Sequence, residues 1–454
     1  MSNYEKFEKQ FIQRTKKSKE MYEEARKYLP GGVPGNGRFM KPYPLYWKDA
    51  KGARIIDVDG NEYIDMRAAG GPIILGYNPP AVVEAVKAQL EHGTHTFLTS
   101  KVVFELAKKI CQHMRGVEMI RFVNSGSEAG HFALRAARVY TGRPKIAKFE
   151  GNFVGSFCDE FISTQVFSGP EDSPEPIADI AGIPESCYKD IVVLPFNNIE
   201  ASVSLIRKHA KELACVIMEP LANFALAGVL AEKPFMEAIR RVTEEEGILL
   251  IWDEVVSGFR FGLGGLEGYY NIVPDMRTLG KIIGGGFPVG AYGGKREIMD
   301  KAVTPTGMPS DKKEKAFQSG TFSGNEITAA AGLALISELE RKNPYSYIDG
   351  LGERLRSGWR KIADDLGIKL QVTGIGSYAG LMFADQPIRN LRDYGRVDLK
   401  KGDAFRLGLY ANGVTFSKHN AFMNAALSEE DIDEVLSVSG HVLREINASI
   451  TTAK

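Results

Sequence analysis

The stretch Ile248-Leu249-Leu250-Ile251-Trp252-Asp253 gives the clearest fold signal in this chain. A short, continuous apolar run of this kind is typical of a strand that is buried on both faces, as in a parallel sheet. Asp253 then falls at the carboxyl end of the strand, where binding sites of open α/β sheets lie. The alternative is that Asp253 only caps the turn that follows.

On either side of this strand, the sequence alternates between helical and extended patterns. Alternation of this kind predicts an α/β fold, with a mostly parallel central sheet sandwiched by helices. We expect helices over 80–92, 127–140 and 235–246, and strands over 119–123, 145–149, 214–218 and 248–252.

The two ends of the chain show other patterns. Residues 3–28 predict a surface helix, and the turn Asp59-Gly60-Asn61 between two alternating runs predicts a hairpin. Residues 156–190 lack periodicity and predict a long surface excursion near the mouth of the site. We therefore expect three regions: an N-terminal helix, loop and hairpin that form part of a small domain (1–75), a large cofactor-binding domain (76–335), and a smaller C-terminal α+β domain (336–454).

Composition excludes several classes of protein. The 454 residues contain 57 Lys and Arg against 57 Asp and Glu, so no net charge draws the chain to nucleic acid or to an anionic membrane. No apolar run approaches the ~20 residues of a membrane span, and the N-terminus lacks the order of a signal peptide. The cysteines form no CxxC pair, which predicts reduced thiols, no metal site and a cytoplasmic protein; they are Cys111, Cys158, Cys187 and Cys215.

Lys281 gives the position of Asp253 a chemical meaning. It lies in Leu279-Gly280-Lys281-Ile282-Ile283-Gly284, among small and apolar residues. Pyridoxal phosphate chemistry needs a lysine amine that bonds the cofactor aldehyde and a carboxylate that keeps the pyridine nitrogen protonated. Most lysines are simply solvated, so this pair alone does not decide the function.

Two glycine-rich turns suit a phosphate group. In Asn124-Ser125-Gly126-Ser127, a strand ends and a helix begins, so free backbone N–H groups and the helix dipole favour an anion. The stretch Gln318–Asn325, which includes Thr321, has the same character before another helix. The alternative in both places is an ordinary helix N-cap. The turn Asn124–Ser127 is neither a Walker motif nor a dinucleotide-binding fingerprint.

Two further side chains are candidates for ring and substrate contacts. Phe153 follows the strand over 145–149 and has the planar shape to stack on a ring, although a lone aromatic there is more often part of a core. Arg38 lies in the glycine-rich N-terminal loop. If that loop covers the site, its guanidinium can grip a carboxylate with two parallel hydrogen bonds.

Taken together, these stretches resemble the class III aminotransferases, which are fold type I pyridoxal phosphate enzymes, and most of all the glutamate semialdehyde aminomutases. The similarity covers nearly the whole chain. It is carried by Leu29-Pro30-Gly31-Gly32-Val33, 57–65, 122–129, Asp253-Glu254-Val255-Val256-Ser257-Gly258-Phe259-Arg260, 279–294 and 428–433.

The resemblance implies a role for each candidate. Lys281 would be the Schiff-base lysine, and Asp253 the partner of the pyridine nitrogen. Thr321 would reach the phosphate of the neighbouring subunit, because family sites lie at a homodimer interface, and Arg38 would bind the substrate carboxylate. The remaining contacts would be Ser125, Gly126 and Ser127 to the phosphate, Phe153 and Val255 to the two ring faces, Glu219 to the cofactor, and Asn223 to its ring hydroxyl.

Several positions depart from the aminomutase pattern. Val154 replaces the histidine that usually follows the stacking aromatic, and Glu326 stands where proline often follows Gly-Asn. Asn420 falls where aminomutases carry an acidic residue, and Leu221–Phe224 is out of step with their pattern. These changes bear on the substrate, whereas Lys281 and Asp253 are retained.

The expected function is therefore a pyridoxal phosphate-dependent aminotransferase that moves an amino group from a small-molecule donor to a keto acid or aldehyde acceptor in a ping-pong reaction. The alternative is glutamate-1-semialdehyde 2,1-aminomutase, in which the amino group moves within one molecule. A racemase or epimerase, and a non-catalytic binding protein with the same fold, remain further alternatives. The expected assembly is a homodimer with shared active sites.

Overall fold

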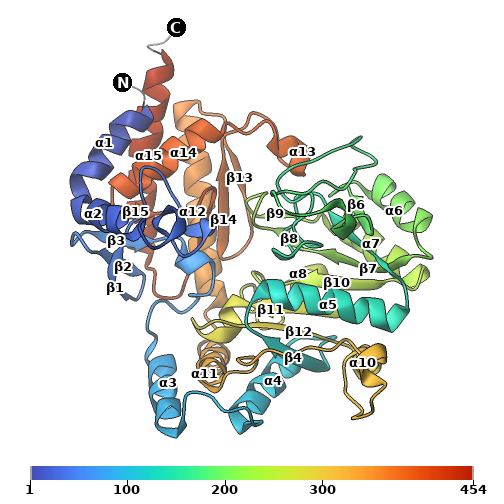
Figure 1. Ribbon diagram of the computed structural model, residues 1–454. Coiled ribbons are helices and arrows are strands. Elements are labelled where there is room, and N and C mark those ends of the chain that lie inside the picture. The colour runs from blue at the N-terminus through green and yellow to red at the C-terminus, as the bar shows by residue number, and fades with distance from the viewer. Residues whose placement is uncertain (1–2, 452–454) are drawn as a thin grey trace. The chain divides into compact units, whose positions relative to one another are not determined.

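The computed structural model describes residues 3–451 of the chain (Figure 1). The chain divides into two compact units. Unit 1 comprises Met1–Pro79, Ser346–Gln386 and Val397–Lys454, and unit 2 comprises Pro80–Tyr345 and Pro387–Arg396. Within the described residues, no helix has the length and apolarity needed to cross a bilayer.

The core of unit 2 is a seven-stranded sheet in the order β4-β12-β11-β10-β7-β5-β6. Neighbours from β11 to β6 pair in parallel, whereas β12 is antiparallel to both β11 and β4. Every residue of β7, β10 and β11 is buried, as the continuous apolar run in β10 predicted. The strands are β4 (Met119–Val123), β5 (Lys145–Phe149), β6 (Ile191–Leu194), β7 (Leu213–Met218), β10 (Leu249–Asp253), β11 (Met276–Gly280) and β12 (Gly290–Gly294).

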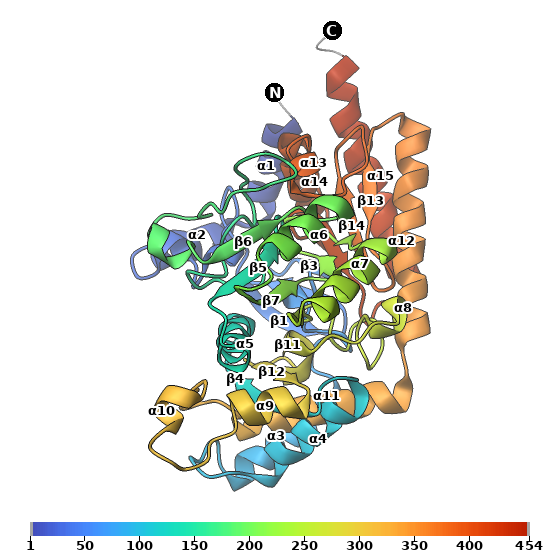
Figure 2. The same ribbon diagram turned by 90° about the vertical axis from the view of Figure 1, so that its right-hand side faces the viewer.

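Helices cover both faces of this sheet. Helix α5 (Gly126–Thr141) lies on one face, with α6 (Ile199–Lys208) and α7 (Lys233–Glu245) on the other (Figures 1 and 2). Small residues on the buried side of α5, among them Ala133 and Ala137, let the helix approach the strands closely and pack into the core with Ile217 and Ile251.

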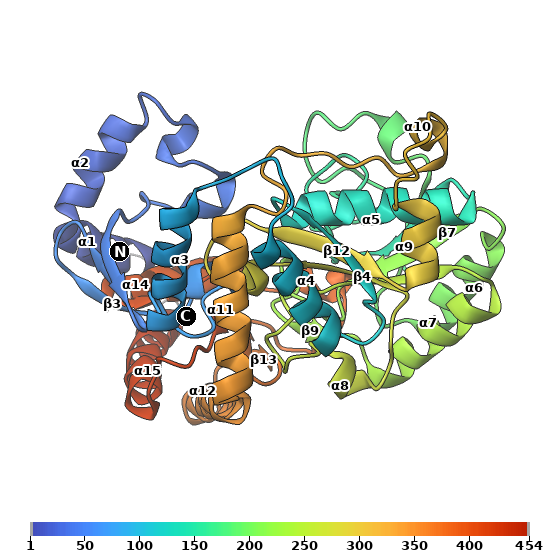
Figure 3. The same cartoon turned by 90° about the horizontal axis from the view of Figure 1, so that it is seen from below.

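A second group of helices lies beyond β4. Helix α11 (Glu326–Lys342) packs between α3 (Pro80–His92) and α4 (Lys101–His113), as Figure 3 shows from below. The shorter elements of unit 2 are α8 (Glu267–Tyr270), α9 (Arg296–Ala302), α10 (Asp311–Glu314), α13 (Leu391–Tyr394), the 3-10 turns η4 (Glu185–Cys187) and η5 (Lys281–Gly284), and the ribbon of β8 (Leu221–Ala222) with β9 (Val229–Leu230).

Unit 1 contains two small sheets, β1-β2-β3-β15 and β13-β14-β16, and its helix α14 packs against both α1 and α15. Its strands are β1 (Trp47–Lys51), β2 (Arg54–Asp57), β3 (Glu62–Asp65), β13 (Gln371–Thr373), β14 (Tyr378–Met382), β15 (Val414–Thr415) and β16 (Asn420–Phe422). Its helices are α1 (Asn3–Arg14), α2 (Lys16–Ala25), α12 (Tyr345–Leu366), which begins at the last residue of unit 2, α14 (Leu399–Ala411) and α15 (Glu429–Thr451), with 3-10 turns η1 (Pro30–Gly32), η2 (Asn36–Arg38) and η3 (Ala68–Gly70).

The N-terminal helix and the division of the chain differ from the sequence-based expectations. The N-terminal segment forms two helices that are separated at Thr15. The hydroxyl of Thr15 donates to the Phe11 carbonyl at 2.7 Å, a side-chain bond of the kind that competes with the hydrogen bonds of a regular helix. The units do not follow the ranges 1–75, 76–335 and 336–454: all of α11 stays in unit 2, up to Tyr345, and residues 387–396 return to that unit.

The excursion over 156–190 is not wholly a surface segment. Residues 160–164 are buried because they fold over the ammonium group of Lys148, which lies on β5. Lys148 Nζ donates to the carbonyl oxygens of Glu160 (2.8 Å) and Ile162 and to the hydroxyl of Thr164 (3.0 Å). A buried ammonium must find such acceptors, and this loop supplies them.

Candidate active site

Acidic side chains meet where neighbouring strands of unit 2 end. Asp253 is the last residue of β10, and Glu219 directly follows β7, whose Met218 pairs with Trp252. Both carboxyl groups are buried. Asp253 Oδ1 accepts the backbone N–H of Val255 at 2.9 Å, which closes the turn after the strand. The alternatives for Asp253 are therefore not exclusive, since it caps a turn and also belongs to a cluster of acids.

Burial governs the protonation of these acids. It raises the pKa of Asp253 to about 7, against the lowering effects of the Val255 N–H and the Lys281 cation. Burial, and then the negative charge of Asp253, raises the pKa of Glu219 to about 8. At neutral pH the pair therefore does not carry two full negative charges, because like charges in a poorly solvated place disfavour ionisation.

Lys281 follows β11, the strand next to Asp253, and opens the turn η5. Its backbone is in the left-handed region, with φ of +47°, which is strained for a residue with a side chain. Burial lowers the pKa of its amine, while Asp253 and Glu219 act in the opposite direction. The lowered pKa favours the neutral, nucleophilic form of the amine that bond formation to a carbonyl carbon requires.

Glu219 holds the backbone of Phe153 in place. Glu219 Oε2 accepts the backbone N–H of Phe153 at 2.8 Å, and the N–H of Glu219 donates to Asn152 Oδ1 at 2.8 Å. The ring of Phe153 contacts Phe224 at 4.7 Å and Phe161 at 5.5 Å between centroids. Asn223 lies at the same bend, and its backbone N–H approaches Glu219 Oε1 at 3.4 Å.

The turn Ser125–Ser127 forms the N-terminus of α5. Ser125 is the N-cap, and its hydroxyl accepts the N–H of Glu128 at 3.2 Å, while the hydroxyl of Ser127 bonds Ser156 at 3.0 Å. The N-cap interpretation is thus confirmed for Ser125. It is compatible with an anion site, because the first-turn N–H groups of a long helix point to the same place.

Val255 links this turn to Lys281. A Cβ atom added to Gly126 would lie 2.8 Å from a Val255 methyl group, and one added to Gly280 would lie 3.1 Å from it. The backbones on either side therefore approach Val255 as closely as they do only because both residues are glycine. The Val255 side chain therefore lies between the turn Ser125–Ser127 and Gly280, the residue before Lys281.

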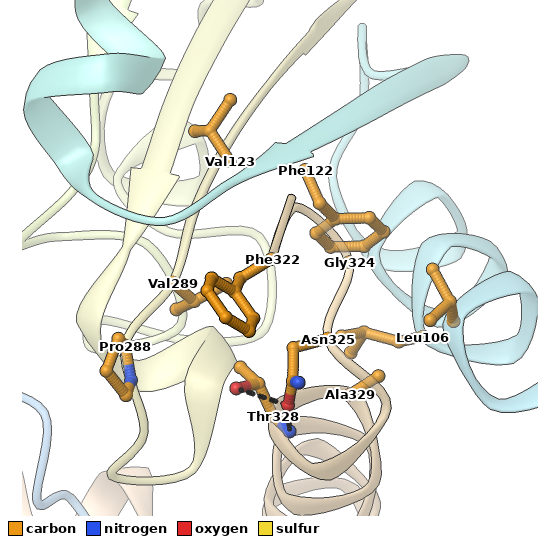
Figure 4. A pocket seen from close by; sticks show the side chains of 11 residues that line it. Leu106, Phe122, Val123, Pro288, Val289, Phe322, Gly324, Asn325, Thr328 and Ala329 are labelled. Carbon is orange, nitrogen blue, oxygen red and sulfur yellow. Dashed lines mark hydrogen bonds between the residues drawn. The ribbon is translucent and has the colours of Figure 1, made fainter. Parts of the chain in front are cut away.

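The loop Gln318–Asn325 packs on the end of β4. Gln318 Nε2 donates to the Phe122 carbonyl at 3.3 Å, and Gly320 lies against the amide of Asn124, the residue before the Ser125 turn. Thr321 itself is exposed. The loop also borders an apolar pocket with Phe122, Phe322 and α11 (Figure 4). That pocket is separate from Asp253 and Lys281, which are not among its lining residues.

Two candidates belong to unit 1 and are described with that unit alone. Arg38 ends the 3-10 turn η2 and is exposed, and the carbonyl of the preceding Gly37 accepts a hydrogen bond from Arg67 at 3.3 Å. Asn420 begins β16, is buried, and donates from its amide to the Tyr378 hydroxyl at 2.5 Å.

Sequence reasoning missed the buried charges around the site. Burial lowers the pKa of Lys148 to about 8 and raises that of Glu160 to about 9. On β11, Arg277 is buried and donates to the carboxylates of Glu254 and Glu267. A charged residue within an otherwise apolar strand was the available signal for both Lys148 and Arg277, because such a residue must have buried partners.

These residues fit the cofactor that the sequence suggested. A buried carboxyl group that titrates near neutrality suits a pyridine nitrogen, and a partly neutral lysine amine suits an aldehyde. The helix N-terminus beside Gly126 and Ser127 suits a phosphate, in a cradle that a Cβ on Gly126 or Gly280 would fill. The donor set thus matches the aldehyde, ring nitrogen and phosphate of pyridoxal phosphate.

Comparison with known sequences agrees with this set of residues. The profile of the family described as aminotransferase class III matches residues 38–434. The chain belongs to the class III aminotransferases. Members of this family are pyridoxal phosphate-dependent enzymes, and so is this protein. The predicted fold type I architecture is confirmed as well.

Individual members of the class III family resemble the chain over nearly its full length. The glutamate-1-semialdehyde 2,1-aminomutase of Persephonella marina is 39% identical over 436 residues, which cover 95% of this chain and 99% of the relative. The structure of an omega-transaminase from Sphaerobacter thermophilus is 33% identical, with a TM-score of 0.89 over 94% of this chain and 97% of that one. A transaminase with bound pyridoxal phosphate is 30% identical, with a TM-score of 0.86 over 96% and 99%.

Proposed function

We propose that this class III enzyme is a glutamate-1-semialdehyde 2,1-aminomutase, which moves an amino group within one substrate molecule. The observation that carries the proposal is the similarity to relatives of that name, eight of which are 37–39% identical over at least 92% of this chain. It reverses the order of the two activities expected from the sequence, where intermolecular transfer came first.

Five side chains would hold the cofactor in the core of the site. Lys281 would hold it covalently, Asp253 would share a proton with its ring nitrogen, and the first turn of α5 with Ser125 and Ser127 would bind its phosphate. Phe153 would face its ring, in a position fixed by the bond from its N–H to Glu219. The expected contacts of Val255, Asn223 and Glu219 stay part of the same proposal.

Bound pyridoxal phosphate supplies an electron-accepting ring conjugated with the substrate nitrogen. The residues of the chain do the rest. The amine of Lys281 would take a proton from the substrate carbon that bears the nitrogen and return it to the cofactor carbon on the other side of that nitrogen, a kind of assistance worth about 10²–10⁴ in rate. Asp253 would share a proton with the ring nitrogen, because burial raises the pKa of its carboxyl group to about 7.

A second candidate is an aminotransferase that acts between two molecules. The observation in its favour is Asn420, which stands where the aminomutases carry an acidic residue and donates its amide to Tyr378. The 33% identical omega-transaminase is also consistent with it. An amide at this position cannot carry the negative charge that an acidic residue offers to a substrate amine.

One experiment separates the two activities. Purified enzyme loaded with the amine form of the cofactor is given glutamate-1-semialdehyde with no other donor or acceptor, and 5-aminolevulinate is measured over many turnovers. Sustained formation supports the aminomutase. If 5-aminolevulinate does not accumulate beyond about one equivalent, and the enzyme turns over only when a separate amino acid donor and keto acid acceptor are supplied, the enzyme is an aminotransferase.

The proposal includes a homodimer in the cytoplasm with shared active sites. Large apolar side chains are exposed on two neighbouring segments, which fits a surface covered by a second copy; the fractions are 82% for Phe97, 80% for Leu98, 61% for Phe104, 70% for Phe317 and 60% for Phe322. Sharing is tested by mixing Lys281→Ala and Thr321→Ala protomers. Hybrids with one fully restored cofactor site support sharing, and the absence of any restoration contradicts it.

A further inference from the structure

Glu326 joins two segments that are far apart in sequence. It is the first residue of α11, and its carboxylate is buried. Its Oε2 bonds His95 Nδ1 at 3.0 Å, and its Oε1 accepts the hydroxyl of Thr96 at 2.9 Å and the Thr96 N–H at 3.4 Å. The neighbouring Asn325 donates to the Thr94 carbonyl at 3.1 Å. These hydrogen bonds therefore hold residues 94–96 against the start of α11.

The carboxylate is ionised in this setting. Burial alone would raise the pKa of Glu326, but bonds from its own backbone N–H, from Thr96 and from His95 outweigh burial and lower it. A negative charge at the first turn of a 17-residue helix is also favoured by the helix dipole.

Residues 94–96 contact the C-terminal end of the loop Gln318–Asn325. The His95 ring contacts the ring of Phe322 at 5.3 Å between centroids, and Ser323 accepts a bond from Gln318 at 3.2 Å. At the other end of the loop, Gln318 bonds the Phe122 carbonyl and Gly320 lies against Asn124. Figure 4 shows Phe322, Gly324 and Asn325 side by side with Phe122 above α11. A continuous set of contacts thus runs from His95 to the residue before Ser125.

We propose that Glu326 is a positioning residue for the cofactor's phosphate. By fixing residues 94–96 against α11, it holds the Thr321 loop in the shape that packs on Asn124 and so keeps the Ser125–Ser127 turn in place. The proposal rests on the proposed function, since it takes that turn and Thr321 as the phosphate contacts. Glu326 acts through these residues and does not itself touch the cofactor.

The test compares pyridoxal phosphate with pyridoxal, which lacks the phosphate. In Glu326→Ala, the donors of Thr96 and His95 lose their acceptor, so residues 94–96 are no longer held against α11. We expect the Kd for pyridoxal phosphate to rise about tenfold. The Kd for pyridoxal should stay within twofold of the unchanged protein. Both constants are measured from the visible absorbance of the lysine-bound aldehyde.

Two further variants keep the test decisive. Glu338→Gln removes a carboxylate from the same helix, away from residues 94–96, and should change neither constant. Thr96→Val keeps Glu326 and removes one donor, so it should reproduce part of the selective loss even if Glu326→Ala folds poorly. Equal weakening of both ligands, or no weakening, overturns the proposal.

Failure of the proposed function would look different. If the enzyme proves to be an aminotransferase, the activity assay changes while the phosphate-selective loss remains. If the selective loss is absent but 5-aminolevulinate still forms, only the role of Glu326 is wrong.

Discussion

Asp253 and Lys281 stand at the ends of two neighbouring parallel strands, and each shifts the pKa of the other. Asp253 pairs in register with Thr278, three residues before Lys281. The carboxylate raises the pKa of the lysine amine, and the ammonium lowers the pKa of the carboxyl group, while burial drives both groups toward their neutral forms. This mutual influence supports the proposed roles of Lys281 as the nucleophile and of Asp253 as the acid that shares a proton with the ring nitrogen.

Replacement of Lys281 tests the first of these roles. Lys281→Ala should lose the visible absorbance of the lysine-bound cofactor and at least ~10²-fold in turnover, because the covalent link and the proton carrier disappear together. The fold should persist, since the substitution removes an amine whose burial in the site is unfavourable to its charged form. Borohydride reduction followed by peptide mapping locates the bond; a label on any lysine other than Lys281 contradicts the assignment.

Gly126 and Val255 give a test of the phosphate turn. Gly126→Ala places a methyl group 2.8 Å from Val255, so we expect a stability loss of ~1–3 kcal/mol and weaker binding of pyridoxal phosphate. Val255→Ala in the same chain removes the obstacle and should recover much of the loss, which urea unfolding and cofactor titration will measure. Additive effects of the two substitutions would show that the contact does not shape the turn.

The regular elements of unit 2 were predictable because each is coded locally. The apolar run in β10 and the Pro80–His92 helix carry their own periodicity, and both appear where the sequence placed them. The division of the chain was harder. Helix α11 continues without a break past residue 335, and whether it belongs with one unit or another depends on its packing against α3 and α4, which no local pattern records.

In the candidate site, too, some residues could be predicted from the sequence and others could not. Asp253, Lys281 and the Ser125 turn lie at ends of elements, so the sequence could predict their places in the fold, whereas their chemical roles stay predictions. Glu160 could not be found, because its burial follows from Lys148, twelve residues earlier, drawing the loop over itself. Isolated charges in a loop have no periodicity, and only the folded contacts show which of them are buried.

Arg38 is expected to act on the substrate and not on stability. It is exposed at the end of η2, so Arg38→Ala should leave the unfolding midpoint unchanged. We expect a raised KM for carboxylate substrates with a smaller effect on uncharged amines, and only partial recovery in Arg38→Lys, because a lysine cannot bind a carboxylate with two parallel bonds. Steady-state kinetics on both substrate types will measure this. The same KM for acids in all three proteins would remove Arg38 from the site.

Arg277 should matter for stability. Its guanidinium is fully buried between Glu254 and Glu267. Arg277→Met leaves the buried Glu254 carboxylate without its cation and Glu267 with Arg115 alone, and should cost about 3–5 kcal/mol in urea unfolding. Arg341→Met, which breaks an exposed pair with Glu338, is the control and should change little. A loss no larger than that of the control would mean that water reaches the Arg277 cluster.

Glu160 predicts how stability depends on pH. Burial raises the pKa of its carboxyl group to about 9 from an ordinary 4.5, so between these values the folded protein holds a proton that the unfolded chain has released. The contribution of Glu160 to the free energy of unfolding is therefore fully present at low pH. It is lost as pH rises toward 9, by at most ~1.4 kcal/mol per pH unit. Asp253 and Glu219, whose pKa values are also raised, act in the same direction over a lower window.

Glu160→Gln removes this titration while keeping an acceptor for the Phe157 N–H that Glu160 Oε2 binds at 3.0 Å. Urea unfolding of the cofactor-free protein at about pH 5.5 and about pH 8.5 should therefore show a smaller loss of stability in the variant than in the unchanged protein. The control Glu185→Gln, at an exposed position of the same excursion, should keep the original slope. Parallel curves for Glu160→Gln and the unchanged protein would show that Glu160 is already ionised, and that the Lys148 ammonium compensates its charge across the whole range.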